Sequence, residues 1–318
     1  VLGDPRGDGY GFGDTGTRLV MPMQITSLQL PRAGGAGQLM RGQRPRLPQL
    51  LMTPANARRV ADQLATLRGA AMKLGQLISM DGGEVLPAEL SEIFARLRAE
   101  AAPMPAAQLD AQLTAAWGSG WRGRFARFSE RPVAAASIGQ VHRARTHEGR
   151  ELAIKVQYPG VAASIDSDVD NVATLIRLSG LLPAGFDVAP LLAEAKAQLH
   201  EEADYGREGA ALAQFGALLA GEADFLVPGL AAEFSTPTVL AMDWVPGVAI
   251  EAAAALPQAQ RDRVAGLLLE LTLRELFDFR LCQTDPNFAN YRYDLGSGRI
   301  VLLDFGAARD VPAHIREG

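Results

Sequence analysis

The sequence has little cysteine and histidine, and this scarcity excludes two ways of stabilising a fold. A single cysteine, Cys282, stands in 318 residues, so no disulfide can form within the chain. This favours a reducing compartment of the cytosolic type, with Cys282 as a core residue rather than a redox switch. The four histidines lack the spacing of metal ligands (His142, His147, His200 and His314), so we expect no structural zinc site.

The sequence also lacks a long apolar run and an excess of basic residues. No uncharged apolar run of about 18 residues is present, so no membrane-spanning helix is predicted. The most hydrophobic stretch, 264–277, is interrupted by charges and is predicted to be a core helix. Lys and Arg number 31 against 36 Asp and Glu, a net charge of −5, which is not typical of a general nucleic-acid-binding protein. We expect a cytoplasmic protein of bacterial type.

What is present divides the chain into four segments. Residues 1–50 are rich in Gly, Pro and Arg without a sustained period, so we expect them to be disordered or loosely attached. Their basic stretch 41–46 is ordinarily a solvated linker, although peripheral contact with an anionic inner-membrane surface stays open. Residues 51–122 are predicted to be helical, with an amphipathic helix after Thr53–Pro54 whose apolar positions follow spacings of 4-3-4-3-4. Two further helices are expected in this segment, at 87–99 and 105–117.

The remaining two segments alternate between strands and helices. In 123–247 the period changes to that of strands, and an antiparallel meander is predicted from about 125 to 157. Helices are expected after it at 160–180 and 188–220, then strands at 226–230 and 238–245. Pro246–Gly247 predicts a turn between two lobes. The last segment, 248–318, is expected to hold a helix at 258–280, a loop at 283–291 and a strand at 299–304.

Four features in this order indicate chemistry on nucleotide phosphates. The loop Ala134–Val141 has the frame of G-x-G-x-x-G-x-V, and Lys155 follows in A-I-K at the end of a strand. Asp285 and Asn290 stand five residues apart, and Asp304 lies in L-L-D-F-G. Each feature alone is weak, but together they predict a protein-kinase-like fold.

The residue types suit ATP and Mg²⁺ as cofactors. A strand lysine, Lys155, would give a fixed cation for the α- and β-phosphates. Asn290 and Asp304 would hold Mg²⁺ through oxygen atoms. Asp285 is expected to accept a proton from an attacking hydroxyl or water, or to orient it.

Two departures separate the pattern from an ordinary protein kinase. The expected H-R-D is Q-T-D at 283–285, which removes the arginine that usually binds a phosphorylated activation loop. Alanine replaces two of the three loop glycines, which predicts a stiffer loop with altered nucleotide placement. The expected nucleotide-binding positions are Ala134, Ala135, Ala136, Ser137, Ile138, Gly139 and Val141. Ser137 either binds phosphate or caps a turn, and both readings stay open.

Six motifs over about residues 50–310 resemble the ABC1, ADCK or UbiB family of atypical kinase-like proteins, which is associated with ubiquinone biosynthesis. They are M-K-L-G-Q (72–76), A-A-A-S-I-G-Q-V-H-R-A (134–144), A-I-K-V-Q-Y-P-G-V (153–161), E-A-D-Y (202–205), Q-T-D-P-N-F-A-N (283–290) and L-L-D-F-G-A (302–307). The resemblance implies a two-lobed α+β kinase-like fold. An all-helical extension (51–122) precedes the N-lobe with its helical insertion (123–247), and 248–318 begins a C-lobe that is expected to be incomplete.

The resemblance also implies a KxGQ motif at Lys73–Gln76 and an ExD motif at Glu202 and Asp204. Lys73 and Gln76 fall opposite the apolar stripe of their helix, which ordinarily means a solvated face. Because small and apolar residues surround them, we expect the helix to cover the ATP cleft and to point both side chains inward. A buried Lys73 needs an anion, for which Asp204, Glu202 or a catalytic Asp could serve. For Lys155, the resemblance favours Glu202 over Glu201 as partner.

The expected function is Mg²⁺-dependent ATP binding and hydrolysis, or phosphoryl transfer to an acceptor that the sequence does not specify. The resemblance implies a role in ubiquinone or related isoprenoid-lipid biosynthesis, with lipid or quinone-pathway partners. The alternative is a pseudokinase-like scaffold that a nucleotide switches. The complete set of Lys155, Asp285, Asn290 and Asp304 favours chemistry over the scaffold.

Overall fold

A computed structural model of the protein describes residues 69–70, 73, 103–136, 138–179, 187–285 and 287–312. All of them belong to one compact unit, Ala57–Gly318. The segment 1–50 and the predicted helix 87–99 lie outside the described residues. Of the predicted helix after Thr53–Pro54, only Gly69, Ala70 and Lys73 are described, and all three are helical.

The first sheet is built by the predicted antiparallel meander. Its strands run in the order β1 (Phe125–Phe128), β3 (Gly139–Thr146), β4 (Glu151–Gln157) and β6 (Val239–Asp243), and the short β2 (Ala134–Ala135) pairs with β3. All of these pairings are antiparallel. Along β4, Leu152, Ile154 and Val156 are buried, whereas the residues between them are partly exposed. This alternation places one face of β4 in the core and leaves Lys155 on the other.

The core of the sheet is closed by α6 (Ala106–Trp117), the helix predicted at 105–117. Leu109 and Leu113 of α6 pack against the buried side chains of β4 and against an aromatic group that follows in the chain. The indole N–H of Trp117 donates to the carbonyl oxygen of Phe234 at 3.0 Å, across 117 positions of sequence. The buried aromatic members of this core are Trp121, Phe125 and Phe234, and the partly buried Trp117, Phe128 and Tyr158 pack against them.

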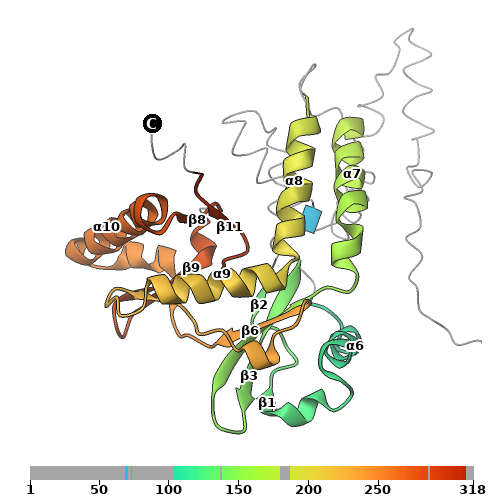
Figure 1. Ribbon diagram of the computed structural model, residues 1–318, viewed down its shortest axis with the longest axis horizontal. Helices are drawn as coiled ribbons and strands as arrows, with labels where there is room; N and C mark the ends of the chain where they lie inside the picture. Colours follow the sequence, from blue (N-terminus) through green and yellow to red (C-terminus); the bar gives the residue numbers. More distant parts are fainter. Residues whose placement is uncertain are drawn as a thin grey trace, which may run out of the picture. The chain divides into compact units, whose positions relative to one another are not determined.

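The residues described between β4 and β6 include three α-helices. They are α7 (Val161–Ser179), α8 (Ala189–Glu202) and α9 (Tyr205–Leu218), and α7 and α8 lie side by side (Figure 1). A single helix was predicted at 188–220, and this was wrong. The chain breaks at Asp204, whose non-helical backbone starts α9 and whose carboxylate accepts from the N–H of Arg207 at 2.9 Å. This is an N-cap, which aspartate favours.

The second half of the described chain holds two small sheets. One has four strands, β5 (Phe225–Leu226), β10 (Arg299–Leu302), β9 (Tyr291–Asp294) and β7 (Val248–Ala249), and the other pairs β11 (Ala308–Asp310) with β8 (Leu281–Gln283). Strand β8 ends at Gln283 of Q-T-D, and β11 begins two residues after D-F-G, so their pairing brings the two motifs together. Short 3₁₀ helices lie at Trp121–Arg124, Ala232–Phe234, Ile250–Ala255 and Phe288–Asn290.

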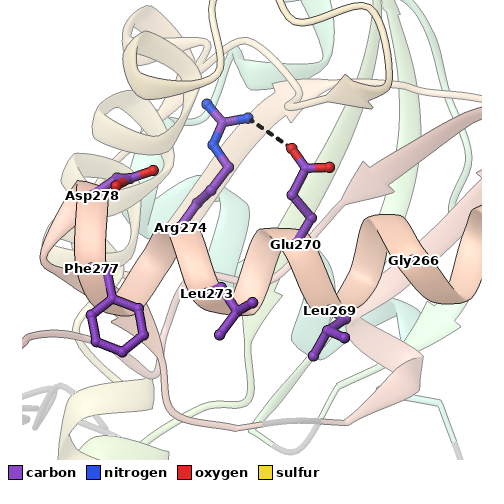
Figure 2. Close-up of a pocket in the computed structure, with 7 residues that line it drawn as sticks. All are labelled: Gly266, Leu269, Glu270, Leu273, Arg274, Phe277 and Asp278. Atoms are coloured by element: carbon purple, nitrogen blue, oxygen red, sulfur yellow. Dashed lines mark ion pairs between the residues drawn. The ribbon is translucent and has the colours of Figure 1, made fainter.

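The helix predicted at 258–280 consists of α10 (Gln258–Arg274) and a π-helical turn, Glu275–Phe279. One face of α10 is buried through Val264, Leu267 and Leu271, as expected for a core helix. The opposite face is exposed: Figure 2 shows Leu269, Leu273 and Phe277 pointing away from the Glu270–Arg274 ion pair. All five side chains line one surface pocket. Within the described ranges, no helix has the length and apolarity that crossing a membrane requires.

Candidate functional site

Lys155 lies at the centre of a charged cluster. Its ammonium nitrogen is 2.8 and 2.9 Å from the two carboxylate oxygens of Glu208, and 3.5 Å from Oδ2 of Asp304. Glu208 is fully buried in the first turns of α9. Three elements that are distant in sequence therefore meet at one cation.

The predicted partner of Lys155 was wrong. Glu202 was favoured over Glu201, but Glu208 holds the position. The reason is the break at Asp204, which ends α8 and starts α9 with Glu208 near its beginning. The break is fastened to β4, because the side-chain amide of Gln157 donates to the carbonyl oxygen of Ala203 at 2.7 Å. The sequence signal for this arrangement was Asp204, a residue type that favours the N-cap position, with Glu208 four residues after it.

Burial and charge act against each other in this cluster. Burial alone would lower the pKa of Lys155, but the carboxylates of Asp304 and Glu208 outweigh it and raise that pKa well above its usual value. Burial raises the pKa of Glu208 to about 7, although the charge of Lys155 opposes the shift. Burial would also raise the pKa of Asp304, but Lys155 and the N–H of Gly306 hold it below its usual value. Lys155 and Asp304 are therefore charged in the folded protein at neutral pH.

The alanine-containing loop is a tight hairpin of β2 and β3. Ala134 pairs with Val141, and the N–H of Ala136 donates to the carbonyl oxygen of Gly139 at 2.9 Å. Only the third glycine of the motif is sterically required, because a Cβ at Gly139 would lie 2.4 Å from the carbonyl oxygen of Val156. Ala134 and Ala135 are exposed, and the side chain of Ile138 is buried in the protein. Ser137 lies outside the described residues, so its two interpretations stay predictions.

Lys73 is buried, and its ammonium nitrogen lies 2.8 Å from Oε1 of Glu202. The alternative of a solvated helix face therefore does not hold for this residue. Of the three anions considered for Lys73, Glu202 is the one in ion-pair distance. Asp204 is exposed and caps α9. Gln76 lies outside the described residues.

The Q-T-D segment is connected to D-F-G by a side chain that the sequence analysis did not single out. The amide nitrogen of Gln283 donates to the carbonyl oxygen of Asp304 at 2.5 Å, and its amide oxygen accepts from the N–H of Asp285 at 3.2 Å. Thr284 adds two bonds, from its N–H and its hydroxyl, to the carbonyl oxygen of Ala307. Gln283 occupies the histidine position of H-R-D, and that place in the motif was the signal for its role.

Asp285 and Asn290 lie on the same loop and contact each other. The side-chain amide of Asn290 donates to the backbone carbonyl oxygen of Asp285 at 3.2 Å. Burial raises the pKa of Asp285, while the charge of Lys73 lowers it and those of Glu202 and Asp304 raise it further. The charges of Lys73 and Lys155 and those of the carboxylates therefore act on one another across the site.

Glu275 is a buried carboxylate that bonds to the backbone at the start of this loop. Its Oε2 accepts from the N–H of Gln283 at 3.0 Å, and its Oε1 has no partner among the described residues. Burial raises its pKa to about 7. In the sequence, Glu275 is one of the charges that interrupt the apolar stretch 264–277, and no further role was predicted for it. Its burial depends on the π-helical turn, which the spacing of residues did not reveal.

Comparison with known proteins shows the family to which the chain belongs. Residues 96–318 match a family model described as the ABC1 atypical kinase-like domain. The chain belongs to this family. A solved relative in this comparison, Rv3197 of Mycobacterium tuberculosis in complex with erythromycin, is 34% identical with a TM-score of 0.56, over 78% of this chain and 63% of that one. The α+β kinase-like fold is thereby confirmed.

Curated relatives of this ABC1 chain include two named atypical kinases. The mitochondrial atypical kinase coq-8 of Caenorhabditis elegans is 42% identical over 262 residues, which is 81% of this chain and 35% of that protein. The mitochondrial atypical kinase COQ8 of Saccharomyces cerevisiae is 38% identical over 277 residues, or 87% of this chain and 55% of that protein. The chain thus spans between about a third and somewhat over half of these relatives.

Most of the predicted polar site residues of the ABC1 chain come together. Lys155 and Asp304 are in ion-pair distance, and Lys73 acts on Asp285 through its charge. The first two loop alanines are exposed, and Asp204 acts on the helix start. Glu208 and Gln283 were missed, and both contact a predicted site residue directly.

Proposed function

We propose that this chain carries the nucleotide-binding part of an atypical kinase-like ATPase or phosphotransferase. The observation that carries the proposal is Lys155, whose ammonium group is fixed between Glu208 and Asp304. A cation held in this way can bind nucleotide phosphates without first being ordered, which lowers the entropy cost of binding.

The residues present fit a bound Mg²⁺. Asp304 is ionised at neutral pH, and Asn290 lies on the neighbouring loop, so both can supply oxygen ligands. In the part of the chain that the structure describes, no group of three or more His, Cys, Asp or Glu side chains gathers to hold a metal. This suits Mg²⁺, which usually takes one or two carboxylates together with the phosphates of its nucleotide. When bound, Mg²⁺ would neutralise phosphate charge.

Asp285 is the residue that we assign to the attacking group. Burial raises its pKa, which moves the carboxyl toward the range in which a general base works at neutral pH. Gln283 and Asn290 both bond the backbone of Asp285 and keep it in place. Asp285 would take the proton of a hydroxyl or water, or orient that group for attack on the terminal phosphate.

The wider role that we propose is support of ubiquinone or related isoprenoid-lipid biosynthesis. It rests on the six motifs and on relatives named coq-8 and COQ8. Lipid or quinone-pathway partners, and a cytoplasmic place with peripheral contact at the inner membrane, belong to the same proposal.

One observation favours the second candidate, a nucleotide-switched scaffold. Lys73 comes from the segment before the sheet, and it is paired with Glu202 close enough to affect Asp285. A cation at that point would compete with the hydroxyl of an incoming phosphoryl acceptor for the Asp285 carboxylate.

The test is an ATPase assay of the complete chain with and without Mg²⁺, and with and without vesicles containing anionic lipid. We expect Mg²⁺-dependent turnover that Asp285→Asn abolishes while ATP binding persists. If Asp285→Asn still restores quinone levels in cells lacking the wild-type protein, the scaffold replaces the enzyme. Absence of any Mg²⁺-dependent nucleotide binding would refute both candidates.

A further inference from the structure

Arg207 binds the backbone of the last residue of D-F-G and of a residue that follows it. One guanidinium nitrogen donates to the carbonyl oxygen of Gly306 at 2.7 Å, and another donates to the carbonyl oxygen of Ala308. Arg207 lies in the first turn of α9, next to Glu208 and three residues after the capping Asp204. The same helical turn therefore contacts both Lys155 and the D-F-G segment.

Gly306 connects Arg207 to Asp304 through hydrogen bonds of its backbone. The N–H of Gly306 donates to Oδ1 of Asp304 at 3.0 Å, and its carbonyl oxygen accepts from Arg207. The other carboxylate oxygen of Asp304 faces Lys155 at 3.5 Å. Since a planar guanidinium with two bonds fixes both position and orientation, Arg207 restrains the backbone at Gly306, whose N–H the Asp304 carboxylate accepts. The orientation of the Asp304 carboxylate depends on that N–H.

The charges around Arg207 supply a matched control. Oε2 of Glu201 lies 3.6 Å from Arg207 and 3.0 Å from Arg309 of β11. Arg309 also approaches Glu194 at 3.5 Å. Both arginines are partly exposed and share Glu201. The side-chain hydrogen bonds of Arg309 go to carboxylates of α8, whereas those of Arg207 go to the carbonyl oxygens of Gly306 and Ala308.

We propose that Arg207 is a positioning residue for Asp304. By holding Gly306, it keeps the Asp304 carboxylate in the orientation that a divalent cation bound with a nucleotide requires. Glu208 of the same turn holds Lys155 at the opposite side of that carboxylate. This inference rests on the proposed function, because Asp304 must be a metal ligand for it to apply.

The experiment measures ADP binding to the complete chain in a Mg²⁺ titration and, separately, in EDTA. The variants are Arg207→Gln, Arg207→Lys and Arg309→Gln, each with its thermal midpoint. For Arg207→Gln, we expect the Mg²⁺ concentration at half-maximal binding to rise about tenfold or more, since charge-assisted bonds are lost. Affinity in EDTA should stay within about twofold of wild type. Arg207→Lys should fall between, because lysine keeps the charge but not the two-pronged geometry.

Arg309→Gln should leave the Mg²⁺ dependence unchanged. If it raises the Mg²⁺ requirement as much as Arg207→Gln, or if Arg207→Gln weakens ADP equally with and without Mg²⁺, the positioning role is overturned. Unfolding of both Arg207 variants would overturn it too, in favour of a purely structural role. If the wild-type chain shows no Mg²⁺-dependent binding, the proposed function fails first. If the wild type shows it and Arg207→Gln matches the wild type, only the present inference fails.

Discussion

Two lysine–glutamate pairs of equal length lie in this site, yet they are built differently. Both Lys155–Glu208 and Lys73–Glu202 have a nitrogen–oxygen distance of 2.8 Å. Glu208 has no exposed side-chain surface, whereas 18% of the Glu202 side chain is exposed. Lys155 lies on a central strand and meets a second carboxylate, but Lys73 comes from the segment before the sheet. Lys73 itself is buried, with 6% of its side chain exposed against 13% for Lys155, so the difference lies in the carboxylates. We therefore expect the first pair to be part of the fold and the second to be a contact that can open while the fold persists.

The largest expected effect comes from breaking the first pair. Lys155→Met should abolish Mg²⁺-dependent ATP binding, because the fixed cation is lost. It should also destabilise the protein by about 3–5 kcal/mol, since Glu208 would remain buried without a compensating charge. Urea unfolding and nucleotide titration measure the two effects.

The control is another lysine pair of the same length. Lys196 lies 2.8 Å from Asp170, whose side chain is 61% exposed. Lys196→Met should cost about 1 kcal/mol or less and leave ATP binding intact. Equal losses of stability in the two lysine variants would contradict the view that Lys155–Glu208 is part of the fold.

A buried carboxylate that forms no ion pair with a described residue sharpens the comparison further. Glu275 is 3% exposed, accepts from the backbone N–H of Gln283 and interacts with the Cys282 thiol, and burial raises its pKa from 4.5 to about 7. Because the folded value is the higher one, the folded protein keeps a proton that the unfolded chain releases. The stability from this group is thus present below about pH 4.5 and is lost as the pH rises through about 7.

Glu275→Gln should remove this pH dependence. Between pH 5 and 8, wild-type stability should fall relative to the variant by roughly 3 kcal/mol or less. Urea unfolding at several pH values measures the difference, with Glu270→Gln on the exposed side of α10 as the control. A wild-type slope identical to that of Glu275→Gln would show that the buried carboxyl does not titrate in this range.

The sequence predicted much of this arrangement, and its failures have physical reasons. The meander, α6 and the D-F-G strand follow from local periodicity, so they were found from the residues alone. The partner of Lys155 was not, because the choice among Glu201, Glu202 and Glu208 depends on where one helix ends and the next begins. A break of two residues at 203–204 directs Glu201 to Arg207 and Arg309, Glu202 to Lys73, and Glu208 to Lys155.

Gln283 shows a different kind of failure. A substitution in a motif indicates that something has changed, but the replacement bond appears only when two loops are brought together. The Gln283 side chain joins Asp285 to Asp304, which lie 19 positions apart in the sequence. Long-range pairing of β8 with β11 makes this contact, and no local pattern encodes that pairing.

The smallest effect on stability is expected from breaking the second pair. Lys73→Met keeps an unbranched chain of similar size in the buried position, so packing is largely retained. Glu202 keeps access to water, so we expect a cost of about 1–2 kcal/mol, well below that of Lys155→Met. Removal of the cation beside Asp285 should nevertheless change nucleotide affinity or ATP turnover severalfold, because that charge lowers the pKa of the Asp285 carboxyl.

Glu202→Gln is the matched variant on the other side of the same pair. If the pair acts as a contact that opens, both variants should shift nucleotide affinity or turnover in the same direction, with thermal midpoints close to each other. If only Lys73→Met has an effect, the lysine acts on Asp285 directly and the pair itself is incidental. A loss of stability in Lys73→Met as large as that in Lys155→Met would instead make the second pair as much a part of the fold as the first.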